Sequence, residues 1–199
     1  MTGDGVAGRR QGVRERVLAA AVELFAGQGY DATSVQQVVE RAQVTKGALY
    51  HYFSSKDDLL YEIYHHLISL QLAELDAIVA RDMPTADAVG AVIASLVSTT
   101  AAHAQEAAVF GREMHRLDKE RREAIRGDRR RYHETFRAVI DRGQARGELA
   151  AVASAETVTL MVFGMVNQIP VWYRPDGPKD ADQLTREVTD FVLAALRPA

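Results

Sequence analysis

Hydroxyl, amide, phenol, imidazole and ammonium side chains gather around one short predicted helix between Ser34 and Lys56. Such groups hydrogen-bond to phosphate oxygens, and small residues at the leading end of a helix let its backbone approach the base edges of a major groove. The pattern therefore predicts contact with double-stranded DNA. The residues expected to make this contact are Ser34, Gln43, Thr45, Lys46, Gly47, Ala48, Tyr50, His51 and Lys56.

The expected contacts divide by side-chain chemistry. Phosphate contacts are expected from the cationic and aromatic members of the set, which are Lys46, Tyr50, His51 and Lys56. Thr45 and Ser34 would add hydroxyl hydrogen bonds, and Gln43 and Thr45 are the candidates for reading bases. Because Gly47 and Ala48 carry almost no side chain, few direct base contacts are expected and DNA shape would contribute to specificity.

Two short helices joined by a tight turn would position this cluster. Ser34 and Gln37 have the spacing of a capping box at the start of the first helix. Thr45 is a natural N-cap for the second helix, which is expected to run to Tyr52. An ordinary helical hairpin is the alternative. It explains the apolar and aromatic residues here, but it does not explain why polar residues collect at one end.

The chain is predicted to be all-α and to have three parts. These are a flexible, glycine-rich N-terminal arm at residues 1–10, a three-helix DNA-binding unit at 11–58, and a helical ligand-binding and dimerisation domain at 59–199. Apolar residues recur at three- and four-residue spacing throughout, and no strand-like alternation occurs. The helices expected after the DNA-binding unit lie near residues 56–78, 85–102, 103–117, 119–147, 155–171 and 181–196.

The helix from Ala155 to Val171 is nearly all apolar, so it must be covered on every side. One side would face its own domain and the other a second subunit. Together with the last helix, it would form a four-helix dimer interface. The residues expected there are Val158, Val162, Val166, Leu184, Val188, Phe191 and Val192.

Aromatic and methionine residues also cluster in the C-terminal part. Each one alone is best explained by core packing, but as a group they suit a pocket for a hydrophobic molecule. The residues expected to line that pocket are Phe110, Met114, Phe136, Met161, Met165 and Trp172.

The composition of the chain excludes several other kinds of site and protein. The chain has 199 residues, of which 47% are hydrophobic and 26% charged, and it has no cysteine. This excludes disulfides and thiol catalysis, and no metal or cofactor site is indicated. No catalytic constellation emerges, since Ser95, Ser98 and His103 lack a placed carboxylate. No apolar run long enough for a membrane span and no signal peptide are recognised, so a cytoplasmic protein without a membrane partner is expected.

The stretch from about Arg14 to Leu60 resembles the DNA-binding signature of TetR-type transcriptional regulators. The resemblance is carried by Thr33-Ser34-Val35, Ala42, Thr45 to Phe53, and Lys56 to Leu59. It implies a homodimer on a roughly palindromic operator, with repression relieved by a ligand.

A second, shorter resemblance lies near the C-terminus. The segments from Gly164 to Asn167 and from Trp172 to Pro178 are similar to those of TetR-type repressors that respond to acyl-CoA thioesters and control fatty-acid, phenylacetate or steroid-ring catabolism. This implies an acyl-CoA effector. A regulator that responds to many drugs or other hydrophobic ligands, and a helical enzyme, remain as alternatives.

Overall fold

The computed structural model describes residues 4–198, with side chains described from Gly12 onward. Over this range, helices are the only regular secondary structure, which confirms the all-α prediction. The helices are α1 (Asp4–Gln28), α2 (Val35–Ala42), α3 (Lys46–Tyr50), α4 (Lys56–Val79), α5 (Thr85–Ala102), α6 (Ala104–Glu113), α7 (Lys119–Ala145), α8 (Ala155–Trp172) and α9 (Ala181–Ala195), with a 3-10 turn, η1, at Met114–Arg116.

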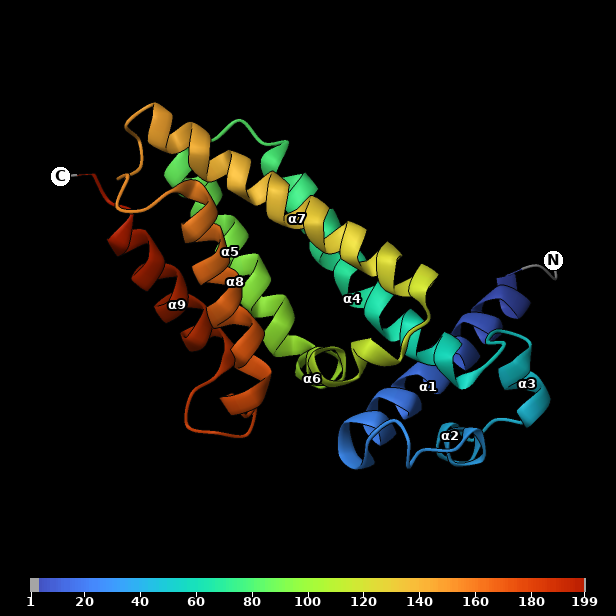
Figure 1. Ribbon diagram of the computed structural model, residues 1–199. Helices are drawn as coiled ribbons and strands as arrows, with labels where there is room; N and C mark the ends of the chain where they lie inside the picture. The colour runs from blue at the N-terminus through green and yellow to red at the C-terminus, as the bar shows by residue number, and fades with distance from the viewer. Residues whose placement is uncertain (1–3, 199) are drawn as a thin grey trace.

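The helices form a small head and a larger body. Figure 1 shows α1, α2 and α3 at one end of the molecule and α5, α8 and α9 at the other, with α4 and α7 running along the length between them. Helix α6 crosses between the two parts and contacts α1 on one side and α4 and α8 on the other. The head therefore joins the body through α4 and α6.

Side-chain caps define the helices of the head. The Ser34 hydroxyl accepts the Gln37 amide hydrogen, and the Gln37 side chain accepts the Ser34 amide hydrogen at 2.8 Å, which confirms the predicted capping box. Ser55 caps α4 through the Asp58 amide. Asp58 does not complete a box with Ser55, because its carboxylate accepts from the Ser54 amide at 2.9 Å instead.

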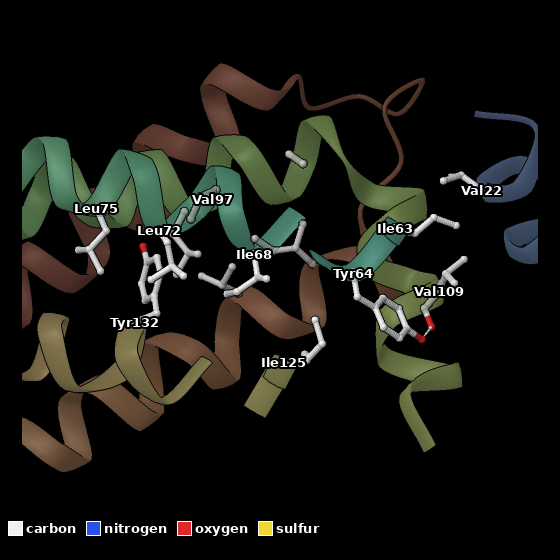
Figure 2. Close-up of a cluster of buried hydrophobic side chains, with 14 of the residues drawn as sticks. Val22, Ile63, Tyr64, Ile68, Leu72, Leu75, Val97, Val109, Ile125 and Tyr132 are labelled. Carbon is white, nitrogen blue, oxygen red and sulfur yellow. Dashed lines mark hydrogen bonds between the residues drawn. The ribbon is translucent and has the colours of Figure 1, made fainter. Parts of the chain in front are cut away.

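One continuous hydrophobic core runs through head and body. It extends from Val17 in α1 to Leu196 beyond α9. Figure 2 shows the part around α4, with Val22 of α1 and Val109 of α6 at one end and Tyr132 of α7 at the other. The dashed line marks the hydrogen bond that the Tyr64 hydroxyl donates to the Val109 carbonyl oxygen at 3.0 Å. A shift of α6 would therefore change its packing against α1 and α4.

Three boundaries differ from the sequence-based expectations. Helix α1 begins at Asp4, so residues 4–10 are helical rather than a flexible arm; no proline interrupts the chain there, and residues 1–3 lie outside the described range. The helix expected over 103–117 is divided, because the backbone tightens into η1 after Glu113. Helix α3 ends at Tyr50, two residues early.

Helix α5 corrects the expectation that no run is apolar enough to span a bilayer. Its 18 residues reach the length and hydropathy of a membrane span. However, more than half of that window is buried inside the protein, where α5 packs against α4, α7, α8 and α9. Burial on several sides in the core accounts for its composition.

Candidate nucleic-acid interface and internal cavity

A left-handed residue forms the turn between α2 and α3. Gln43 has φ 53° and ψ 49°, a conformation that non-glycine residues seldom adopt. Its amide hydrogen bonds the Glu40 carbonyl at 3.2 Å, and the Val44 amide bonds the Val39 carbonyl at 3.0 Å. These two bonds reverse the chain within a few residues, so α3 leaves the turn in a direction fixed by backbone geometry.

Helix α3 is anchored from behind and exposed in front. Leu49 is fully buried, whereas Lys46 and Gly47 in its first turn are exposed. The Thr45 hydroxyl accepts the Ala48 amide hydrogen at 3.1 Å, which leaves the slim leading end of the helix facing solvent. A helix of this build presents its N-terminal residues to a groove.

The predicted DNA-contacting residues, apart from Lys56, lie together on this surface. Ser34, Gln43, Thr45, Lys46, Gly47, Tyr50 and His51 are exposed, and Ala48 is partly buried. Tyr50 keeps 47% of its surface exposed although it is aromatic, and the Lys46 ammonium lies 6.0 Å from its ring. Their participation in DNA binding stays a prediction.

Lys56 does not present a free ammonium. Its Nζ donates to the carbonyl oxygens of Tyr30 and Thr33 at 2.8 and 2.9 Å, and lies 4.0 Å from the centre of the Tyr30 ring. The lysine therefore ties the loop before α2 to the start of α4. Lys56 thus has a structural role that its sequence context did not suggest, and its contact with DNA phosphate stays a prediction.

The same loop is held by a second contact. The Tyr30 hydroxyl donates a hydrogen bond to Asp57. Burial, together with this carboxylate, raises the pKa of Tyr30 well above its ordinary value, so the phenol stays protonated and keeps donating. The loop that leads into α2 is thus fixed to α4, which positions the two short helices of the head.

The body has a partly open cavity of about 630 Å³ between α4, α5, α6, α7 and α8. Its size falls in the range of small-molecule sites. Its lining is mainly apolar or aromatic, with a few polar groups. The residues that line it are Tyr64, Leu67, Ile68, Gln71, Leu96, Thr100, Ala107, Phe110, Gly111, Arg129, Arg130, Tyr132, His133, Leu160, Phe163, Gly164, Val166, Asn167, Gln168 and Pro170.

Among the residues predicted to line a pocket, only Phe110 faces this cavity. Phe136 is fully buried in the core, Met114 and Met165 pack against the core, and Met161 and Trp172 are exposed. Helical geometry explains the difference. In α8, the side chains three and four residues apart that face the cavity include Leu160, Phe163 and Asn167, whereas the methionines and Trp172 lie on another face.

The predicted dimer residues require a similar correction. Five of them are buried inside their own subunit and belong to the core, namely Val158, Val162, Val166, Leu184 and Val192. Val188 is partly buried. Only Phe191 of α9 is exposed, at 67%; Met161 and Trp172 of α8 are exposed as well. The apolar helices were predicted correctly from the sequence. However, the apolar residues at the most regular three- and four-residue spacing face the core of the same subunit and not a second subunit.

Three arginines connect the body to the head, and sequence reasoning missed their role. Arg112 of α6 donates to the Ala26 carbonyl oxygen of α1 at 3.0 Å, and Arg116 of η1 pairs with Asp31. Arg121 of α7 pairs with Asp58 of α4 at 2.8 Å. Their partners lie 63 to 86 residues away in the sequence, so spacing alone carried no signal for these contacts.

Both parts of the chain match known protein families. Residues 17–63 match the model for bacterial regulatory proteins of the tetR family. Residues 82–196, more than half of the chain, match the tetracyclin repressor-like C-terminal domain.

Relatives of similar length extend these matches. The HTH-type transcriptional repressor KstR2 of Mycobacterium tuberculosis is 26% identical over 195 residues, which are 97% of each chain. The structure of this ketosteroid transcriptional regulator has a TM-score of 0.85 at 22% identity and covers 94% of this chain and 95% of its own. The fatty acid metabolism regulator protein of Bacillus subtilis is 21% identical over 182 residues, 91% of this chain and 94% of the relative.

A further likeness of fold is to AibR, whose crystal structure contains isovaleryl coenzyme A and operator DNA. Its TM-score is 0.78 at 22% identity, over 90% of this chain and 97% of AibR.

Proposed function

This chain belongs to the TetR family of bacterial regulatory proteins and is a DNA-binding transcriptional repressor, and from that premise we propose that it binds a two-fold operator as a homodimer and is released by an acyl-CoA-type ligand. The family also excludes the helical enzyme that the sequence left open. We assign operator binding to 11–58 and ligand binding and dimerisation to 59–199. The observation that carries the proposal is that one chain has both an exposed α3 and a cavity, and that α6 connects them. Helix α6 lines the cavity and contacts α1, and α1 contacts α3.

On DNA, each subunit would place α3 in a major groove. Lys46, Tyr50 and His51 would contact phosphates, while Gln43 and Thr45 would reach base edges. Two-fold symmetry requires the two copies of α3 to meet half-sites one helical turn, about 34 Å, or a multiple of it apart. The operator is therefore a rough palindrome.

The exposed apolar surface of α8 and α9 supports the dimer. Met161 and Trp172 of α8 and Phe191 of α9 expose more than half of their surface to solvent in the single subunit, and large exposed apolar side chains of this kind would be covered in a dimer. Sedimentation of the wild type at micromolar concentration is expected to give a dimer, and Phe191→Asp to shift it toward monomer. A wild type that sediments as a monomer would remove the dimer from the proposal.

The acyl-CoA assignment has two supports. The cavity combines an apolar lining with a small number of polar groups, which suits an acyl or ring system carrying one polar end. The relatives are named for ketosteroid and fatty acid regulation, and AibR is of the same fold and was solved with isovaleryl coenzyme A.

Helix α6 would pass the signal from the cavity to the head. Phe110 and Gly111 of α6 line the cavity, and Arg112, the next residue, holds the Ala26 carbonyl of α1. A ligand that displaces this part of α6 would favour a head position that fits the operator less well. Typical coupling energies of about 1–3 kcal/mol would lower operator affinity several-fold to about a hundred-fold.

A regulator responsive to many hydrophobic compounds is the second candidate, favoured by the largely apolar lining of the cavity. Both candidates place the protein in the cytoplasm, where operator DNA is found. They differ in ligand selectivity. Release by many unrelated dyes and drugs at similar concentrations supports the second candidate, and a strong preference for thioesters supports the first.

A gel-shift titration tests the proposal. DNA flanking the protein's own gene is titrated with protein, alone and with a panel of acyl-CoA thioesters and the matching free acids. Specific binding released by a thioester supports the whole proposal. Specific binding that no thioester releases removes the acyl-CoA part. If the flanking DNA is not bound, genome-wide binding must find another operator.

A further inference from the structure

Arg129 of α7 is a partly buried cation at the wall of the cavity. Among the described residues, no carboxylate lies within 4.0 Å of its guanidinium, although Arg121, Arg131 and Arg137 of the same helix each have an acidic partner. Burial lowers the pKa of Arg129 from its ordinary value, and no acidic side chain offsets this change. A buried cation without a counter-ion is costly unless something else compensates it.

The contact that Arg129 does make lies inside the cavity wall. Its guanidinium carbon lies 4.9 Å from the centre of the Phe110 ring, and both residues line the cavity. The aromatic face offsets part of the cost of burying the charge, but it accepts none of the guanidinium hydrogen bonds. Among the described residues these donors have no hydrogen-bond partner, so they are available to a ligand in the cavity that Arg129 lines.

His133 lies one turn further along α7 and lines the same cavity. Its ring stacks on Phe163, with the centroids 5.7 Å apart. The Nε2 atom is buried and has no hydrogen-bond partner among the described residues; the nearest carboxylate, that of Glu156, is 3.8 Å away and also pairs with Arg137 at 3.5 Å. The cationic and imidazole groups of the lining thus all come from α7, where Arg130 also lines the cavity but is exposed, whereas the polar groups from the other helices, Gln71, Thr100, Asn167 and Gln168, are uncharged.

We propose that Arg129 is the anion-binding residue of the cavity, with His133 as a second polar contact, and that the physiological ligand is an amphiphile whose negatively charged group lies against α7 while its apolar part lies against Leu67, Ile68 and Leu96. The proposal rests on the proposed function, because it assigns a ligand class to the same cavity. A carboxylate and a phosphate or phosphodiester share the required chemistry, since both accept charge-assisted hydrogen bonds from guanidinium.

A pair of fluorescent probes that differ by one charged group tests the assignment. 8-Anilinonaphthalene-1-sulfonate carries a sulfonate, and N-phenyl-1-naphthylamine is the same ring system without it. Arg129→Gln is expected to weaken binding of the sulfonate probe about tenfold or more, the usual size for a lost hydrogen bond to a charged group, and to leave binding of the neutral probe unchanged.

Two variants control for indirect effects. Arg129→Lys keeps the charge and is expected to recover most of the lost affinity for the sulfonate probe. Arg126→Gln removes an exposed arginine of α7 that does not line the cavity, and it should change the binding of neither probe. Equal losses for both probes in Arg129→Gln, or no loss for either, would overturn the proposal, and thermal unfolding of each variant shows whether it is folded.

Competition then identifies the source of the charge. Decanoate, decanoyl-CoA and decan-1-ol are titrated against the bound sulfonate probe. Stronger displacement by decanoate than by decanol assigns a carboxylate, and stronger displacement by decanoyl-CoA alone assigns the phosphates of the thioester. Equal displacement by decanol argues against an anion site. Because none of these measurements uses DNA, failure of the anion site and failure of operator binding are separate results.

Discussion

The helices that carry the DNA-binding surface of this repressor and the two helices α5 and α6 of its body begin in different ways. In the head, α2, α3 and α4 each begin at a hydroxyl residue whose side chain accepts an amide hydrogen of the first turn. In the body, α7, α8 and α9 also begin at side-chain caps, Asp118, Ser154 and Asp180. Helices α5 and α6 differ, because they begin at Pro84 and His103, neither of which makes such a bond. These two helices are instead fixed by packing, since α5 contacts α4, α7, α8 and α9, and α6 contacts α1, α4 and α8.

This difference matches what each part must do. A DNA-reading surface needs a fixed geometry, because hydrogen bonds to phosphates and bases tolerate little displacement. A ligand-responsive body needs helices that can move relative to one another, and α5 and α6, which both line the cavity, lack a side-chain cap that would resist such movement. The three arginine links described above join the two parts, and the predictions below separate their contributions.

The largest effect is expected from truncating a core side chain in each part. Phe53→Ala and Phe136→Ala remove side chains that are almost fully buried, and each should lower the free energy of unfolding by about 3–5 kcal/mol. Phe53→Ala should abolish operator binding and retain binding of the sulfonate probe, and Phe136→Ala should do the reverse. Urea unfolding, gel shift and probe fluorescence measure this. If each variant lost both activities, head and body would not be separable in this way.

Removing the Lys56 ammonium tests whether this residue is structural. Lys56→Gln loses two hydrogen bonds from a charged donor, so the free energy of unfolding should fall by about 1.5–3 kcal/mol. The slope of operator affinity against salt concentration should stay at the wild-type value, because this ammonium is already bound within the protein. A flatter salt slope in Lys56→Gln would show instead that it contacts phosphate.

Breaking the link between α7 and α4 tests the connection itself. Arg121→Gln removes the partly buried pair with Asp58. Operator affinity without ligand should stay close to wild type, and the ligand-induced loss of affinity should shrink by part of the typical coupling of about 1–3 kcal/mol. Gel shifts with and without ligand measure both quantities, and Arg126→Gln is the matched control. Full release in Arg121→Gln would mean that the signal travels through other contacts.

The smallest effect on stability is expected at Lys46. This side chain is exposed, so Lys46→Ala should change the free energy of unfolding by less than about 0.5 kcal/mol. It should weaken binding to all DNA sequences and lower the salt slope by about 1. Lys46→Ala is thus expected to change the salt slope but not the stability, and Lys56→Gln the stability but not the salt slope. If the two variants behaved identically, the proposed difference between a DNA-contacting lysine and a structural lysine would be wrong.

The sequence predicted the head better than the body for a physical reason. The Ser34 box and the Thr45 cap depend on residues close together in the chain. The cavity depends on how five helices pack, so the methionines and Trp172 that suggested a pocket lie elsewhere. Arg129 and His133 did have a local signal, since they share one face of a helix at four-residue spacing, but only the structure shows that this face meets the cavity.

Gln43 limits how the DNA specificity of this protein could be reprogrammed. The residue holds the left-handed turn, and it is also one of the two side chains expected to read bases. Only glycine, asparagine and aspartate adopt this conformation at little cost, so a library at position 43 samples few usable chemistries. Valine or isoleucine there would shift α3 itself and alter every contact at once. Thr45, which has extended backbone angles, is therefore the better position at which to select new operators.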